Sequence, residues 1–143
     1  MTRIVVDTNV PVCANQKTPQ ASPACVLACI NRLEALKRRG MVVIDDGGAI
    51  VSEYERHLSR AGQPGVGDAF YKWLVSNLAN RYRVKRLAIT ANDAGTSYTE
   101  FPSDPDLAGF DADDHKFVAV AIVAGSRRRP PVVNATDTDW KIF

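Results

Sequence analysis

The stretch RIVVD, Arg3–Asp7, decides the fold class, because a short apolar run stops abruptly at a carboxylate. Ile4, Val5 and Val6 favour a β-strand, and their lack of polar alternation is typical of a parallel strand that is buried on both faces. A carboxylate at the end of a buried strand needs a partner. The stretch therefore predicts an α/β protein and marks Asp7 as a residue to explain.

After this strand, short apolar runs alternate with helical patterns along the rest of the sequence. Ser22 and Pro23 suit the N-cap and first position of a helix that Gly40 ends, and Asp68 suits the cap of a later helix. Residues 91–110 show no clear periodicity, so we expect a long loop there. Strands are expected at 3–6, 41–44, 84–89 and 131–134, and helices at 23–39, 50–61, beyond 68 and at 111–124. The order β-α-β-α-α-β-α-β predicts a three-layer α/β/α fold with a mainly parallel central sheet.

The composition is that of an ordinary globular domain. The 143 residues are 45% apolar and 24% charged, which predicts a single domain spanning residues 1–143. A net charge of +2 provides no strong overall field for nucleic acid, although basic clusters at 37–39, 81–86 and 127–129 fit phosphate contacts. No stretch is apolar enough to span a membrane and no signal sequence is visible, so we expect a cytoplasmic protein without a membrane partner.

Three cysteines, Cys13, Cys25 and Cys29, are too few for a disulfide scaffold. Cys25 and Cys29 are four residues apart on an expected helix, but only His57 and His115 could add nitrogen ligands, so no structural zinc pattern emerges. We interpret the cysteines as buried free thiols in a reducing compartment. We interpret both histidines as packing or surface residues.

Acidic residues end strands or begin helices in four separate segments. In an open α/β sheet these positions lie along one rim, which is where ligands bind. The residues are Asp7 after the first strand, Glu53 in the first turn of the second helix, Asp111, Asp113 and Asp114 at the start of the last helix, and Asp137 and Asp139 after the last strand. The sequence therefore predicts a cluster of carboxylates at this rim.

Each acid also has an ordinary structural explanation. Carboxylates at helix N-termini cap backbone amides and stabilise the helix dipole by about 0.3–1 kcal/mol apiece, and for Glu53 taken alone this explanation is the better one. The acidic triplet that ends at Asp114 exceeds what capping needs. Because hard divalent cations offset the repulsion between clustered carboxylates, Mg²⁺ or Mn²⁺ is the expected cofactor.

Four stretches together resemble the PIN-domain nuclease family, which includes the toxin ribonucleases of bacterial toxin–antitoxin pairs. VVDTNV (Val5–Val10) is similar to the opening strand and first acid of the family, and IVSEYERHL (Ile50–Leu58) is similar to its second segment. DADDHKFVAVAIVAG (Asp111–Gly125) and NATDTDW (Asn134–Trp140) are similar to its third and closing segments. The loop at 91–110 is longer than in compact toxin members of the family.

The resemblance implies a metal-dependent endoribonuclease that hydrolyses RNA phosphodiester bonds. It assigns catalysis to Asp7, Glu53, Asp114 and Asp137, metal binding to Asp7, Asp114 and Asp137, and auxiliary roles to Thr8, Asn9, Asp111, Thr136 and Asp139. Glu53 is either a further ligand or a residue that orients the attacking water. RNA is the implied substrate, and an antitoxin protein and a second copy of the chain are candidate partners. The alternative is a non-catalytic PIN-like module that binds RNA or protein, for which the acids would be unnecessary.

Overall fold

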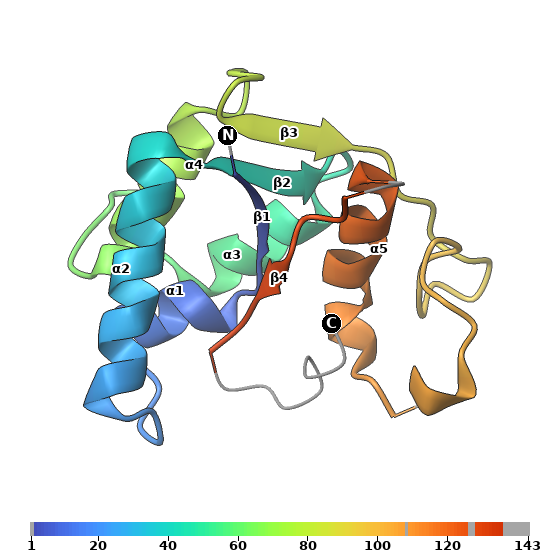
Figure 1. The fold of residues 1–143 in the computed structure, drawn as a ribbon, viewed down its shortest axis with the longest axis horizontal. Coiled ribbons are helices and arrows are strands. Elements are labelled where there is room, and N and C mark those ends of the chain that lie inside the picture. The colour runs from blue at the N-terminus through green and yellow to red at the C-terminus, as the bar shows by residue number, and fades with distance from the viewer. Residues whose placement is uncertain (1, 108, 126–127, 136–143) are drawn as a thin grey trace.

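A parallel β-sheet forms the centre of the computed structural model, which describes residues 2–107, 109–125 and 128–135 (Figure 1). The strands of the described part are β1 (Arg3–Val6), β2 (Met41–Asp45), β3 (Val84–Leu87) and β4 (Val132–Val133). They lie in the order β3-β2-β1-β4, and every neighbouring pair is parallel. The α/β class and the parallel sheet are therefore confirmed.

Helices cover both faces of this sheet. They are α1 (Asn9–Ala14), α2 (Pro23–Arg39), α3 (Ala49–His57), α4 (Val66–Ser76) and α5 (His115–Ala124), with 3₁₀ turns η1 (Pro105–Leu107) and η2 (Ala112–Asp114). The chain moves from β1 to β3 in one direction across the sheet and then returns to β4, so right-handed crossovers place the connecting helices on opposite faces. Accordingly α1, α2 and α4 pack together on one side, and α5 packs along all the strands on the other (Figure 1). The result is the three-layer arrangement that the sequence predicts.

The helix boundaries differ from the sequence prediction at several places. The sequence predicts no helix at α1, because its valines and proline carry no helical pattern. α3 ends at His57 rather than at residue 61, since Leu58 is already extended. α4 begins at Val66, so Asp68 is its third residue rather than its N-cap.

The apolar body of α5 packs into the core. Phe117, Val118 and Val120 are at most 1% exposed, and they share one hydrophobic cluster with the strands. None of the helices in the described ranges combines the length and the apolar character needed to cross a lipid bilayer.

The long loop at 91–110 is held to the start of α5 by His115. The His115 ring stacks on Phe101 with the ring centroids 3.7 Å apart, and His115 Nδ1 lies 2.6 Å from Ser97 Oγ. His115 therefore has a packing role, as the sequence predicts.

Asp68 joins two loops to the start of α4. Its carboxylate accepts hydrogen bonds from the backbone N–H groups of Ser59 (2.8 Å) and Gly65 (3.0 Å) and from the side-chain amide of Asn15 (3.0 Å). Burial raises the pKa of the Asp68 carboxyl, but the hydrogen bonds outweigh burial, and the pKa lies below its ordinary value.

Replacing Asp68 with alanine is expected to lower the free energy of unfolding by about 2–3 kcal/mol, because three donors lose a buried acceptor. The folded-state pKa is lowered, so this stabilisation is present above the unfolded-state pKa and is lost as the pH falls through the folded-state pKa. Thermal unfolding of the two proteins should therefore differ most near neutral pH and converge as the pH falls through the folded-state pKa of Asp68. Asp93→Ala, at an exposed loop position, is the control. Equal stability of Asp68→Ala and wild type at neutral pH would contradict this role.

Candidate active site

Asp7 lies at the carboxyl end of β1, where the strand order of the sheet reverses between β1 and β4. The Asp7 backbone N–H donates to the Val133 carbonyl at 2.9 Å, and the Asn9 N–H donates to Asp7 Oδ1 at 3.0 Å. Asp7 is only 4% exposed. Ligands of open α/β sheets bind at such a reversal point, outside the carboxyl ends of the strands. Asp7 therefore lies at the edge of the sheet where the sequence predicts it.

Glu53 joins three segments of the chain at this rim. The Thr8 hydroxyl donates to Glu53 Oε2, and the Lys116 ammonium donates to Glu53 Oε1 at 2.6 Å. Lys116 also donates to the Asp113 carbonyl. Glu53 and Lys116 are each 8% exposed, so this is a buried ion pair. It holds the end of β1, the middle of α3 and the start of α5 together.

The helix-dipole explanation of Glu53 is wrong. Glu53 is the fifth residue of α3 and lies beyond its first turn. Asp45 serves the α3 N-terminus instead, since its carboxylate accepts from the N–H groups of Ala49 and Ile50, each at 2.8 Å. The sequence prediction is wrong here because Asp45, the last residue of β2, looks in the sequence like an ordinary turn residue. Glu53 is explained instead by its contacts with Thr8 and Lys116 at the rim.

Asp111 and Asp114 have different positions at the start of α5. Asp111 Oδ1 accepts from the Asp113 N–H at 3.0 Å, so Asp111 caps the turn η2. Asp114 is the N-cap residue of α5 and is half-buried. Lys116, two residues after Asp114, contacts Glu53. The turn that carries Asp114 therefore lies at the same rim as Glu53. The predicted roles, supporting for Asp111 and direct for Asp114, are compatible with these positions.

Asn9 connects α1 to the end of β4. Its side-chain oxygen accepts from the Ala135 N–H at 2.9 Å. Ala135 is the last described residue before the closing acidic segment, so Asn9 holds the point from which that segment departs. The predicted site residues Thr136, Asp137 and Asp139 lie outside the described residues.

Tyr54 is buried close to three carboxylates. Tyr54 is fully buried and donates its hydroxyl hydrogen to the Val6 carbonyl. Burial raises the pKa of Tyr54 well above its ordinary value, and the charges of Asp7, Glu53 and Asp45 raise it further. The Tyr54 phenol therefore stays neutral and remains a hydrogen-bond donor beside these acids.

Hard oxygen ligands of the kind that Asp7 and Asp114 offer suit Mg²⁺ or Mn²⁺. Glu53 is less suited to be a ligand, because its two oxygens accept from Thr8 and Lys116. Within the described part of the chain, no three carboxylates have oxygens within 4.8 Å of one another. Asp137, the further predicted ligand, lies outside the described residues.

Lys116 is a candidate residue that the sequence analysis misses. It is the single charged residue among the buried positions 116–121 of α5. A buried ammonium needs a partner, and this requirement is the signal in the sequence that points to Lys116. The identity of the partner is not visible, since Glu53 is 63 residues away along the chain.

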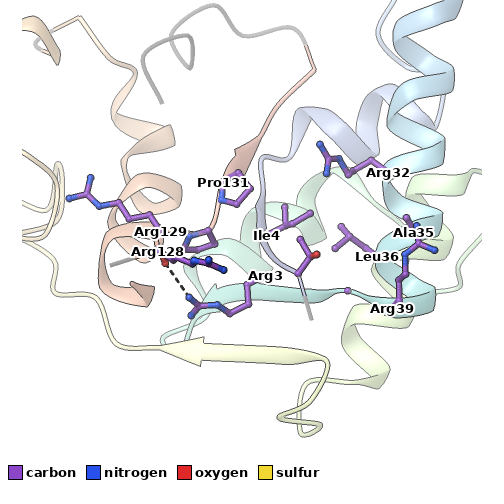
Figure 2. Close-up of a pocket in the computed structure, with 12 residues that line it drawn as sticks. Arg3, Ile4, Arg32, Ala35, Leu36, Arg39, Arg128, Arg129 and Pro131 are labelled. Carbon is purple, nitrogen blue, oxygen red and sulfur yellow. Dashed lines mark hydrogen bonds between the residues drawn. The ribbon is translucent and has the colours of Figure 1, made fainter. Parts of the chain in front are cut away.

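A second charged feature, which we name the arginine hollow, lies at the opposite, amino end of the strands. It has a volume of about 880 Å³, and its lining includes Arg3, Arg32, Arg39, Arg128 and Arg129 but no acidic side chain of the described residues. Figure 2 shows Arg32 and Arg39 on α2 at one side of the hollow and Arg128 and Arg129 at the other. The Arg3 guanidinium donates to the Arg128 carbonyl at 3.1 Å, which ties β1 to the far wall. The hollow therefore presents an unusual density of positive charge.

No protein-family model, no curated protein and no solved structure matches this chain. Function is therefore inferred from the fold, from the arginine hollow and from the acidic rim, by which we mean Asp7, Glu53 and Asp114 at the carboxyl edge of the sheet.

Proposed function

We propose that this protein is a divalent-metal-dependent endoribonuclease of the PIN-domain type. The observation that carries this proposal is the convergence of Asp7, Glu53 and the turn of Asp114 at one rim, beside the reversal of strand order. Asp45 and Asp111 accept from backbone N–H groups of their own turns, whereas Glu53 accepts from side chains of two other segments at the rim that also carries Asp7 and Asp114. A metal-assisted phosphodiesterase requires such a set of carboxylates from separate segments.

The side chains of the rim have separable roles in this proposal. Asp7 and Asp114, together with Asp137, would hold Mg²⁺ or Mn²⁺, which supplies an activated water and offsets the charge of the phosphate. Glu53 is fixed by two hydrogen bonds and positions the segments around it. Lys116 adds a positive charge at the rim, which reduces the repulsion between the acids and an approaching RNA phosphate.

The test is RNA cleavage by the purified protein with Mn²⁺, with Mg²⁺ and with EDTA, on single-stranded and structured RNAs and on DNA of the same sequence. We expect internal cleavage of RNA that depends on the divalent cation and stops in EDTA. A protein that cuts none of these RNAs and binds no Mn²⁺ would instead support the non-catalytic binding module.

The toxin role in a toxin–antitoxin pair is an extension of the same proposal, and it rests on the resemblance of the four acidic segments. A toxin nuclease is expected to arrest growth of a bacterial host when its expression is induced, and Asp7→Asn should relieve the arrest. Normal growth with active nuclease in the cells would remove the toxin role while leaving the nuclease activity in place.

RNA as the substrate is supported by the arginine hollow. Arg3 is the first residue of β1, and Asp7 directly follows the strand. The two residues are four positions apart, which corresponds to roughly 13 Å at about 3.3 Å per residue. Because β1 itself is buried, an RNA strand that contacts both the acidic rim and the hollow would run over the surface between them. Arg32 and Arg39 are exposed on α2 and available for such contacts.

The double variant Arg32→Gln/Arg39→Gln is expected to bind single-stranded RNA about 10-fold more weakly at low salt. Each lost phosphate contact should lower the slope of log affinity against log salt concentration by about 0.7. Fluorescence anisotropy in EDTA measures binding without cleavage. The control is Arg38→Gln, which is exposed on the same helix but does not line the hollow. An equal loss of affinity in the control would show that only overall charge matters.

A further inference from the structure

The sulfur atoms of Cys13, Cys25 and Cys29 meet between α1 and α2. Cys13 belongs to α1, and the other two cysteines lie one turn apart on α2. The three Sγ atoms lie within 4.8 Å of one another, and the Sγ atoms of Cys13 and Cys25 are 3.9 Å apart. All three are free thiols; Cys13 and Cys29 are buried, and Cys25 is half-buried. Two helices therefore bring three potential soft ligands to one point.

The spacing of these sulfurs is close to that of a three-sulfur metal site. Zinc–sulfur bonds are about 2.3 Å long, so two sulfurs bound to one tetrahedral cation lie roughly 3.8 Å apart, and two bound to a trigonal cation roughly 4.0 Å apart. The 3.9 Å separation between Cys13 and Cys25 already falls in this range. A disulfide would require the two sulfurs to approach to about 2.05 Å, which is a larger movement.

The two buried thiols of the cluster have raised pKa values. Burial and, to a smaller extent, the adjacent Cys13 thiol together raise the pKa of Cys29 to about 12. Burial also raises the pKa of Cys13. A cation bound by three thiolates would displace protons from the thiols.

We propose that Cys13, Cys25 and Cys29 form a three-thiolate site for a soft, thiophilic cation, Zn²⁺ or Cu⁺. Thiolates select such cations over Mg²⁺ and Mn²⁺, so this site and the acidic rim take different metals. The half-buried Cys25 leaves room for water as the fourth ligand of Zn²⁺. The site does not depend on the proposed nuclease function.

A cation in this site would affect the contacts of Ala135, the residue at the end of β4 that α1 and α2 both contact. The Cys25 thiol donates to the Ala135 carbonyl, with Sγ and the oxygen 3.6 Å apart, while the Asn9 side chain of α1 accepts from the Ala135 N–H. A cation that displaces the Cys25 proton would remove the hydrogen bond that Cys25 donates, so metal binding would change one of the two contacts that hold Ala135.

The test is titration of the reduced, metal-free protein with Cd²⁺, whose bonds to thiolates give an ultraviolet charge-transfer absorption. The Asp7→Asn variant serves as the background, so that carboxylates of the rim contribute less to binding. We expect one equivalent of Cd²⁺ to bind with that absorption, protons to be released, and the affinity to rise with pH. Zn²⁺ or Cu⁺ should displace the Cd²⁺, whereas Mg²⁺ should not.

Cys29→Ala and Cys25→Ala should each lower the affinity for Cd²⁺ by about 100-fold or more, because each removes one ligand. Cys25 is half-buried, so its variant gives a result even where the change at the buried Cys29 impairs folding. The control is Ala28→Ser, at an exposed position of α2, which should bind Cd²⁺ like wild type. A titration without the absorption, or cysteine variants that bind Cd²⁺ as wild type does, would show that the thiols are only core residues.

Discussion

Asp7→Asn is expected to reduce RNA cleavage in Mn²⁺ by about 100-fold or more without loss of the fold. The variant removes a negative charge from the proposed metal site. It retains an oxygen that can accept the hydrogen bond which the Asn9 N–H donates to Asp7 Oδ1 at 3.0 Å. The turn after β1 should therefore survive. Since the variant weakens a proposed ligand, binding of Mn²⁺ should fall together with cleavage, and thermal stability in EDTA should not.

Asp114→Asn should behave like Asp7→Asn, because both carboxylates are assigned to the same cation. Asp113→Asn is the matched control, since Asp113 is exposed and precedes Asp114 directly. It should cleave RNA at the rate of wild type. Undiminished cleavage by a correctly folded Asp7→Asn protein would rule out the acidic rim as the catalytic centre. Equal losses in all three variants would point to general charge rather than to specific ligands.

The position of Asp7 could be predicted from the sequence because the relevant information is local. An uninterrupted apolar run marks β1, and Asp7 is the first residue after it. Alternating strands and helices then require parallel strands, whose carboxyl ends share one edge. The same reasoning places Glu53 and Asp114 at that edge without any knowledge of their contacts.

The pairing of side chains across the rim could not be predicted in this way. Glu53 contacts Thr8 and Lys116, which are 45 and 63 residues away along the chain. Such contacts depend on how α3 and α5 approach the end of β1. The sequence showed neither the packing angle of these helices nor which of Asp45 and Glu53 would serve the α3 N-terminus.

The thiol cluster was missed for a related reason. The spacing of Cys25 and Cys29 places them on one face of α2, but the third sulfur comes from α1. This short helix has no helical pattern in the sequence, because NVPVCA contains a proline and two β-branched valines. Without α1, two cysteines and two distant histidines gave no metal-binding pattern. The arginine hollow likewise combines Arg3, Arg32 and Arg128 from three segments that only the fold brings together.

Lys116→Met is expected to lower the free energy of unfolding by about 3–5 kcal/mol in EDTA, the largest effect on stability that we expect from one substitution at the rim. Methionine fills most of the volume of the lysine stem but removes the charge 2.6 Å from Glu53 Oε1. Glu53 would then be a buried carboxylate that retains the Thr8 hydroxyl and a distant contact with Arg56, whose nitrogen lies 4.0 Å away and whose side chain is 68% exposed. An exposed arginine compensates a buried charge poorly.

Chemical denaturation of Lys116→Met, Glu53→Gln and the double variant measures the interaction as a double-mutant cycle. The double variant should recover much of the stability that Lys116→Met loses, because it contains no unpaired buried charge. Mn²⁺ should stabilise Lys116→Met more than wild type, since the carboxylate released from the ammonium can then approach the cation. Lys37→Met is the control, because it breaks a partly exposed 3.8 Å ion pair with Glu34 and should cost at most about 1 kcal/mol. If Lys116→Met were as stable as Lys37→Met, the Lys116–Glu53 pair would not be the contact that holds the acidic rim together.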